Sequence, residues 1–128
     1  MLINLSNHPS DKWTYEQRKE ALMKFTDITD IPFPLIPPEE DEKYIHESAK
    51  SYKEKCNDIF KEYPDGNENN AVHIMGEFTF TFALINLLLS EGIKCVASTT
   101  KRIVKELENN KNEVTFEFVR FREYRKYE

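Results

Sequence analysis

Short apolar runs bounded by turn-forming residues give the chain its strand pattern. Leu2 to Leu5 is such a run, and it stops at a polar segment that contains a proline. Near the other end of the chain, apolar and polar residues alternate, which is typical of a strand with one exposed face. The pattern predicts five strands, at 2–5, 28–33, 71–75, 93–97 and 114–118.

Apolar residues at helical spacing predict what lies between the strands. Thr14 and Gln17 form a capping-box pattern before a first helix that ends near residue 24. Pro37 and Pro38, followed by acidic residues, predict the first turn of a long second helix that stops at 64–66. The segment 78–90 is apolar almost all round, and Gly92 after it is a natural left-handed cap. A short helix at 100–108 and a turn at 109–112 complete the prediction.

The alternation of strands and helices along the whole chain favours an α/β fold. We expect one Rossmann-like domain over residues 1–128, with a mostly parallel five-stranded sheet, a flavodoxin-like strand order and helices on both faces. In that order the first strand lies beside the third. With 39% hydrophobic residues in 128, the chain can bury a real core.

Charge and cysteine usage narrow the class of protein. The formal net charge of −5 argues against bulk binding to duplex nucleic acid, which needs a basic surface. Cys56 and Cys95 lie in apolar runs without paired spacing, so we expect buried free thiols in a reducing compartment. The apolar segment 78–89 is shorter than a membrane span, and the first residues lack a signal-peptide pattern. These features predict a cytoplasmic protein that does not use a membrane.

Polar segments follow three of the predicted strands, and in open α/β sheets ligands bind beyond such carboxyl ends. Gly76 permits close approach of a ligand, and free N–H groups at the start of the helix after it suit a phosphate. Lys101 and Arg102, at the predicted start of the short helix, add positive charge. The candidate ligand-binding residues are Ser6, Asn7, Ser10, Gly76, Glu77, Thr79, Ser98, Thr99 and Thr100, and the candidate catalytic residues are His8, Lys101 and Arg102.

Each candidate also has a purely structural interpretation. His8 can brace the first turn, Glu77 can complement a helix dipole, and Trp13 can either stack on a base or pack in the core. The hydroxyls of 98–100 can form a simple N-cap. The sequence contains no Walker A loop, dinucleotide fingerprint or metal-ligand cluster, so we expect neither a cofactor nor a metal.

The segments MGEFTFTFAL and CVASTTKR, after an apolar strand that ends in a polar loop, resemble the small Rossmann-like proteins associated with CRISPR antiviral defence. These are the CARF sensor domains and the stand-alone ring nucleases, which bind or cleave cyclic oligoadenylates. The resemblance covers the order of elements over most of the chain. Thr99-Thr100-Lys101-Arg102 stands where some of these families carry a Ser/Thr or Gly-Thr-Lys signature.

The resemblance implies a metal-independent ring nuclease in which the ligand's own 2′-hydroxyl attacks the adjacent phosphorus in line. Lys101 or Arg102 would neutralise the phosphate, and His8 would act as general base or acid. A symmetric ring ligand implies a two-fold homodimer.

Three other interpretations stay open. The first is a non-catalytic module that senses or sequesters a cyclic nucleotide. The second is a deoxyribosyltransferase-like nucleoside enzyme with Glu77 as nucleophile. The third is an interaction protein that docks an acidic partner through its basic tail, 120–126.

Overall fold

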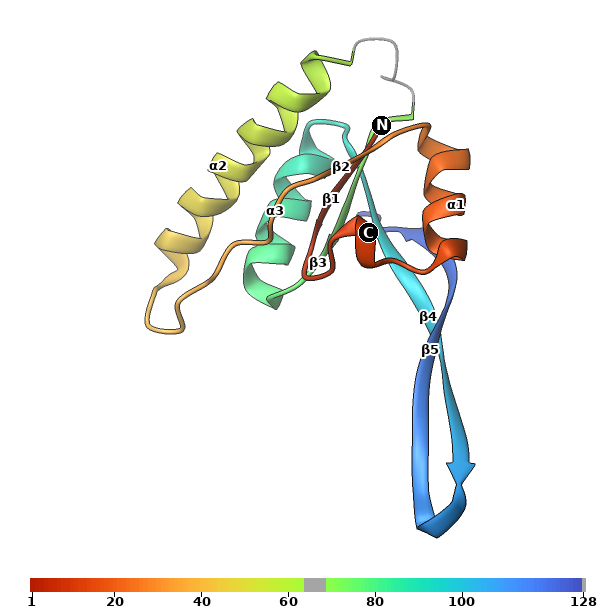
Figure 1. Cartoon of the computed structure of the whole chain (residues 1–128). Helices are drawn as coiled ribbons and strands as arrows, with labels where there is room; N and C mark the ends of the chain where they lie inside the picture. Colours follow the sequence, from red (N-terminus) through yellow and green to blue (C-terminus); the bar gives the residue numbers. More distant parts are fainter. Residues whose placement is uncertain (64–68, 128) are drawn as a thin grey trace.

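A five-stranded sheet with helices on both of its faces organises the chain (Figure 1). The structure is a computed structural model that describes residues 1–63 and 69–127, so the predicted helix stop at 64–66 lies outside the described residues. In chain order the elements are β1 (Leu2–Ser6), η1 (Ser10–Lys12), α1 (Tyr15–Phe25), β2 (Ile28–Asp30), α2 (Glu42–Lys61), β3 (Ala71–Met75), α3 (Phe78–Ser90), β4 (Lys94–Leu107), η3 (Glu108–Asn110) and β5 (Lys111–Glu123).

The strand order is β2-β1-β3-β4-β5, so the α/β fold and the placement of the first strand beside the third are confirmed. β1 pairs in parallel with β2 and β3, and β3 pairs in parallel with β4. The expectation of a mostly parallel sheet is wrong, because β5 runs antiparallel to β4 and the sheet is mixed. The chain returns from β4 through a tight hairpin, and a hairpin joins antiparallel strands without a helical crossover.

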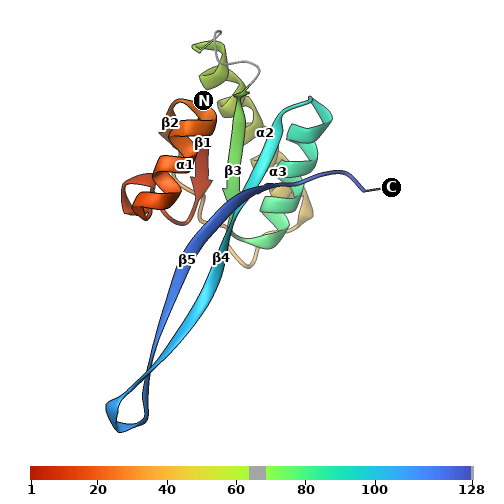
Figure 2. The same ribbon diagram turned by 90° about the vertical axis from the view of Figure 1, so that its right-hand side faces the viewer.

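This hairpin replaces the helix predicted at 100–108. β4 continues to Leu107, the chain turns at Asn109 and Asn110 with φ of 68° and 58°, and β5 returns. Asparagine tolerates this left-handed backbone, which explains why the predicted turn lies close to its place. The distal parts of both strands project away from the body as an arm (Figures 1 and 2). The strands predicted at 93–97 and 114–118 are therefore pieces of two longer strands.

One face of the sheet packs against α2 and α3. Alternate residues of a strand point to opposite faces, so Ile3 and Leu5 of β1 lie beside Val72 and Ile74 of β3 on this face. They join the fully buried α3 side chains Phe80, Leu84 and Leu88, together with Ala49, Cys56 and Phe60 of α2. This apolar layer is the larger part of the core. It also holds Cys95, and both cysteines are buried and free, as predicted.

The opposite face packs against the shorter helix α1, and it changes character along the strands. At its apolar end, Leu2 and Ala71 contact Ala21 and Phe25 of α1. The next residues on this face are polar: Asn4 and Ser6 from β1, and His73 from β3. Only the start of α1 reaches this polar end. The loop after β1, η1 and the base of the hairpin surround the rest of it, and a cavity forms there.

The helix termini follow the local sequence with one shift. The Thr14 side chain accepts a hydrogen bond from the backbone N–H of Gln17, as the capping pattern predicts. α2 begins after Asp41, whose side chain accepts from the backbone N–H of Tyr44, and not at the two prolines upstream. Gly92 has φ of 77°, as expected for the residue that ends α3. Within residues 1–63 and 69–127, no helix is both long and apolar enough to cross a membrane.

Candidate functional site

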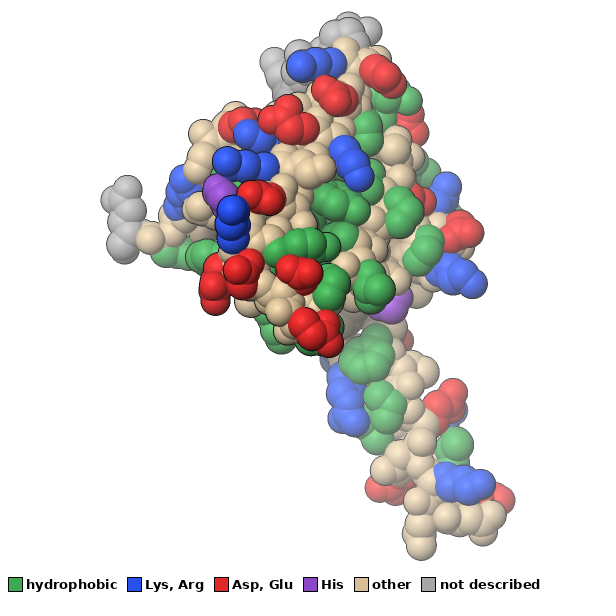
Figure 3. Space-filling view, turned by 90° about the vertical axis from the view of Figure 1, so that its left-hand side faces the viewer, with side chains coloured by type: hydrophobic (Ala, Val, Ile, Leu, Met, Phe, Trp, Pro, Cys, Tyr) green, Lys and Arg blue, Asp and Glu red, His purple; other side chains and the backbone are tan. Residues whose placement is uncertain are grey.

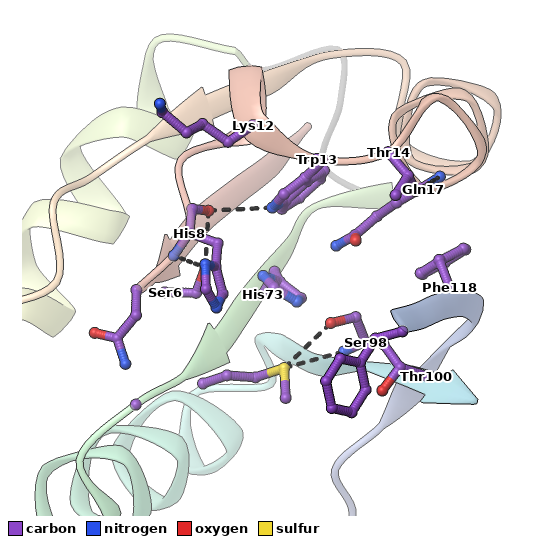
Figure 4. Close-up of a pocket in the computed structure, with 14 residues that line it drawn as sticks. Ser6, His8, Lys12, Trp13, Thr14, Gln17, His73, Ser98, Thr100 and Phe118 are labelled. Carbon is purple, nitrogen blue, oxygen red and sulfur yellow. Dashed lines mark hydrogen bonds between the residues drawn. The ribbon is translucent and has the colours of Figure 1, made fainter. Parts of the chain in front are cut away.

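A cavity of about 630 Å³ opens beyond the carboxyl ends of β1 and β3, beside the middle of β4, on the face that α1 covers. Its walls come from the loop after β1, the start of α1, and the base of the hairpin (Figure 4). Half of the residues predicted for the site line it: Ser6, Asn7, His8, Gly76, Ser98 and Thr100. The predicted meeting of three segments at one edge of the sheet is therefore found.

A buried polar network forms the floor below this cavity. Asn4 is 1% exposed, and its Nδ2 donates to Asp30 Oδ1 at 2.8 Å and to the His8 carbonyl at 2.9 Å. Both partners are acceptors, so the amide orientation follows from chemistry. Asn4 Oδ1 then lies 2.8 Å from Ser6 Oγ and 2.8 Å from His73 Nδ1. At the other end of this network, Asp30 is fixed by two further hydrogen bonds, from the Ser10 N–H and the Ser10 hydroxyl at 3.0 and 2.8 Å.

Three residues of this floor, Asn4, Asp30 and His73, were not among the predicted site residues, and of these His73 lines the cavity. An amide oxygen only accepts, so His73 Nδ1 must carry the proton and Nε2 carries a lone pair. Nε2 is buried and has no hydrogen-bond partner among the described residues. Burial, and secondarily the nearby His8, lower the pKa of His73 from 6.5 to about 4. His73 is therefore neutral at neutral pH. A histidine inside an otherwise apolar buried strand was the available signal, since such a side chain needs polar partners.

Aromatic rings lie against this polar floor and line one side of the cavity. The half-buried indole of Trp13 stands edge-on to His73 with 5.2 Å between ring centroids, and its Nε1 donates to the His8 carbonyl at 3.1 Å. Phe121 lies below both rings, at 6.1 Å from Trp13 and 5.6 Å from His73. Phe118 lines the cavity beside them. Figure 4 shows the Trp13 indole above the His73 imidazole, with Gln17 and Phe118 to the right of both rings. Packing and base stacking are thus both open to Trp13.

The cationic residues divide by the face of the hairpin on which they lie. Arg102 is directly opposite Phe116, and directly opposed residues of an antiparallel pair project from the same face. Phe116 lines the cavity, so Arg102 lies on the cavity side of the arm. Lys101, one residue earlier and opposite Glu117, lies on the other side. Lys12, exposed at the end of η1, is a cavity-lining cation outside the predicted set of site residues.

The predicted phosphate site at the start of α3 is closed by its own residues. The Glu77 carboxylate accepts from the backbone N–H groups of Thr79 and Phe80, and from the Thr79 hydroxyl at 2.7 and 2.8 Å. These hydrogen bonds, that of the hydroxyl above all, lower the pKa of Glu77. Neither Glu77 nor Thr79 lines the cavity. The backbone N–H groups that were expected to face a ligand therefore already donate to the Glu77 carboxylate.

The remaining candidates have structural partners. Ser10 is buried on Asp30, and the Thr99 hydroxyl donates to the Arg120 carbonyl at 3.1 Å. Ser98 and Thr100 line the cavity from a strand, so they present no helix terminus there. The Ser98 hydroxyl lies 3.2 Å from Met75 Sδ, which also lines the cavity.

Gly76 is required for a different reason from the one predicted. Its φ is not in the left-handed region, since Gly92 is the glycine that adopts a positive φ. A β-carbon at Gly76 would instead overlap the ring of Phe33, which packs edge-on against Phe80 at 5.4 Å between centroids. Gly76 still lines the cavity. The glycine therefore lets Phe33, in the segment between β2 and α2, pack over the end of β3.

Comparison with known proteins identifies a family. The chain matches a family model described as "Uncharacterized protein MJ1673 family" over residues 1–122, and it therefore belongs to that family. No curated protein and no solved structure matches the chain. Across the parts of the chain that the structure describes, no group of three or more His, Cys, Asp or Glu side chains is arranged to hold a metal ion.

Proposed function

We propose that this member of the MJ1673 family binds a cyclic oligoadenylate and cleaves it by attack of the ligand's own 2′-hydroxyl. The observation that carries the proposal is one cavity that combines aromatic rings with an exposed histidine and a lysine. Trp13 and Phe118 offer faces on which a base can stack, and such stacking contributes about 1–3 kcal/mol per base. His8 and Lys12 lie at the same opening.

The chemistry needs little more than geometry and two proton transfers. The 2′-oxygen bonds to the adjacent phosphorus while the bond from phosphorus to the 5′-oxygen breaks, which leaves a 2′,3′-cyclic phosphate and a 5′-hydroxyl. His8 accepts the proton of the 2′-hydroxyl, and solvent returns a proton to the 5′-oxygen. Lys12 and Arg102 oppose the negative charge that develops on the phosphate.

The size of the cavity favours a two-fold dimer as the working unit. A volume of about 630 Å³ is in the range that holds one small ligand, not a ring of several nucleotides. Two copies facing one another would each hold one nucleotide of the ring.

The arm supplies a self-complementary face for this dimer. Val104, Val114 and Phe116 share the cavity side of the hairpin and are 46%, 42% and 59% exposed. Arg102 and Glu106 lie on the same side, two residues before and after Val104. A two-fold axis at Val104 would bring this apolar patch of one copy against the same patch of the other. Figure 3 shows hydrophobic side chains continuing from the body onto the arm.

Incubation with cyclic oligoadenylates of three, four and six nucleotides, in chelator and in magnesium, tests the proposal. We expect products that carry 2′,3′-cyclic phosphate and 5′-hydroxyl ends, formed in chelator as well. His8→Ala should slow cleavage about 10²–10⁴-fold, the usual contribution of a general base, and leave binding intact. His46→Ala, an exposed histidine of α2, is the matched control.

Other outcomes point to other functions. Binding without cleavage by the wild type would make the protein a sensor or a sequestering module. Release of free adenine would indicate a nucleoside enzyme, which the engagement of Glu77 in its helix cap does not support. No binding to any of the three rings would overturn the proposal.

The dimer has its own test. Val104→Glu places like charges at the proposed axis and should yield monomers in sedimentation velocity. Ile103→Glu, on the other face of the same strand, should remain dimeric. A monomeric wild type at micromolar concentration with ring ligand present would contradict the dimer.

A further inference from the structure

We propose that His73 Nε2 is a specificity-determining acceptor that takes one hydrogen bond from the bound nucleotide. The donor is an amino group of the base or a hydroxyl of the ribose. This inference rests on the proposed function, and it assigns a role to a residue outside the predicted site.

The unsatisfied state of Nε2 is the first observation. His73 is 2% exposed, and Nε2 is one of two buried side-chain nitrogen or oxygen atoms without a partner among the described residues. The great majority of buried polar atoms are hydrogen-bonded, because an unpaired one costs stability. The other such atom, Thr81 Oγ1, sits on α3, while His73 lines the cavity. A ligand in the cavity can supply the missing donor.

The network behind the ring is the second observation, and it fixes what Nε2 can do. Asp30 orients the Asn4 amide, and the amide oxygen holds the proton on His73 Nδ1. Nε2 is thereby left as an acceptor only, aligned by residues that contact no ligand themselves. An acceptor of fixed direction favours an N–H or O–H group and disfavours a carbonyl, because two acceptors would then face each other.

Trp13 lies between the open part of the cavity and the His73 imidazole that it contacts, and we infer that it limits access to Nε2. The indole stands edge-on against the imidazole and is held by one hydrogen bond from Nε1 to the His8 carbonyl (Figure 4). Trp13 is itself partly exposed at the cavity, so a base that stacks on the indole and displaces it uncovers Nε2. Aromatic stacking and the hydrogen bond to His73 would then act on the same nucleotide.

Three probes separate the two possible donors: AMP, purine riboside 5′-monophosphate, which lacks the amino group, and 2′-deoxyadenosine 5′-monophosphate, which lacks the 2′-hydroxyl. We expect the wild type to bind one of the two analogues about tenfold more weakly than AMP, the loss typical of one hydrogen bond. His73→Asn keeps an N–H near the Nδ1 position and deletes Nε2, so this variant should bind AMP and that analogue equally. His46→Asn should retain the wild-type discrimination.

Nitrogen-15 spectra of the wild-type imidazoles provide a readout that does not depend on a variant that folds. The free protein should show His73 as the Nδ1–H tautomer, and AMP or cyclic tetra-adenylate should shift its Nε2 resonance. Shifts of the Trp13 indole without a shift of Nε2, or unchanged discrimination in folded His73→Asn, would overturn the inference and leave the proposed function standing. No shift of any cavity resonance with either probe would overturn both.

Discussion

Two polar clusters lie near the same edge of the sheet, and they differ in how their hydrogen bonds balance. At the start of α3, the Glu77 carboxylate takes up the N–H groups of Thr79 and Phe80 and the Thr79 hydroxyl. Below the cavity, Asp30, Asn4 and His73 form a chain of equally good hydrogen bonds that ends in an atom without a partner. Both clusters look like sites by residue type. The number of polar residues does not separate the two clusters, but an unused hydrogen-bond acceptor, His73 Nε2, is found only below the cavity.

Acidification should lower the free energy of unfolding because His73 is buried in its neutral form. This is the largest effect on stability that we expect. Unfolded His73 binds a proton near pH 6.5, but the folded residue binds one only near pH 4. The unfolded state therefore holds more protons between these values, and the free energy of unfolding should fall by about 3 kcal/mol as pH drops from 6.5 to 4.

Urea unfolding of wild type and His73→Asn across this range isolates the contribution, since carboxylates titrate in both proteins. The wild type should lose more stability on acidification than the variant does, and His46→Asn should follow the wild type. Parallel pH profiles for wild type and His73→Asn would show that the imidazole is not held neutral by burial.

Two neighbouring cations of the hairpin, Lys101 and Arg102, offer a sharper test of the cavity. Arg102→Ala should weaken binding of cyclic tetra-adenylate by about 1.5–3 kcal/mol, which is the usual contribution of a charge-assisted contact and corresponds to roughly ten- to a hundredfold in affinity. Lys101→Ala, which removes a charge from the opposite face, should change affinity little.

Calorimetry at two salt concentrations completes this test. The difference between the two variants should shrink as salt rises, because exposed charges are screened. Equal losses in both variants would mean that the ligand senses the overall charge of the arm and does not contact one face of it.

The smallest effect is expected at the closed cluster. Glu77→Ala removes the N-cap of α3 and should destabilise the fold by about 1 kcal/mol in thermal or urea unfolding. Glu77→Asp retains a carboxylate at the cap and should lose less. Neither change should alter nucleotide affinity, and a large loss of affinity in Glu77→Asp would return the ligand to the start of α3.

Local pattern was sufficient for the parts of the fold that rest on local chemistry. β3 and α3 have the predicted bounds, and Thr14 caps α1 as expected. A helix was predicted in place of the hairpin because Ile103, Val104 and Leu107 recur at a spacing that also suits a helix. What makes the segment a strand is its partner: Lys101 lies opposite Glu117, and Lys105 opposite Glu113. Such pairing appears only when both strands are considered together.

The sequence predicted that three segments would meet at one cavity, but not how their side chains are arranged there. Topology brings the carboxyl ends of β1 and β3 beside the middle of β4, so Ser6, His8 and Ser98 line one cavity as expected. Whether a carboxylate caps its own helix, or a lysine and an arginine lie on opposite faces, depends on side-chain geometry that one sequence does not contain. His73 was missed because its neighbours in the strand are apolar, and the pattern was interpreted as core.

The number of paired residues in the hairpin sets the length of the arm. Beyond Thr100 and Phe118, its two strands pair with each other in unbroken register up to Leu107 and Lys111. Removing two residues from each strand would shorten the arm by about 7 Å and keep every remaining side chain on its face. Removing one residue from each would turn the distal side chains over to the opposite face of the arm. Arm length can therefore change only in steps of two, and in a dimer joined through the arms each step resets the distance between the two cavities.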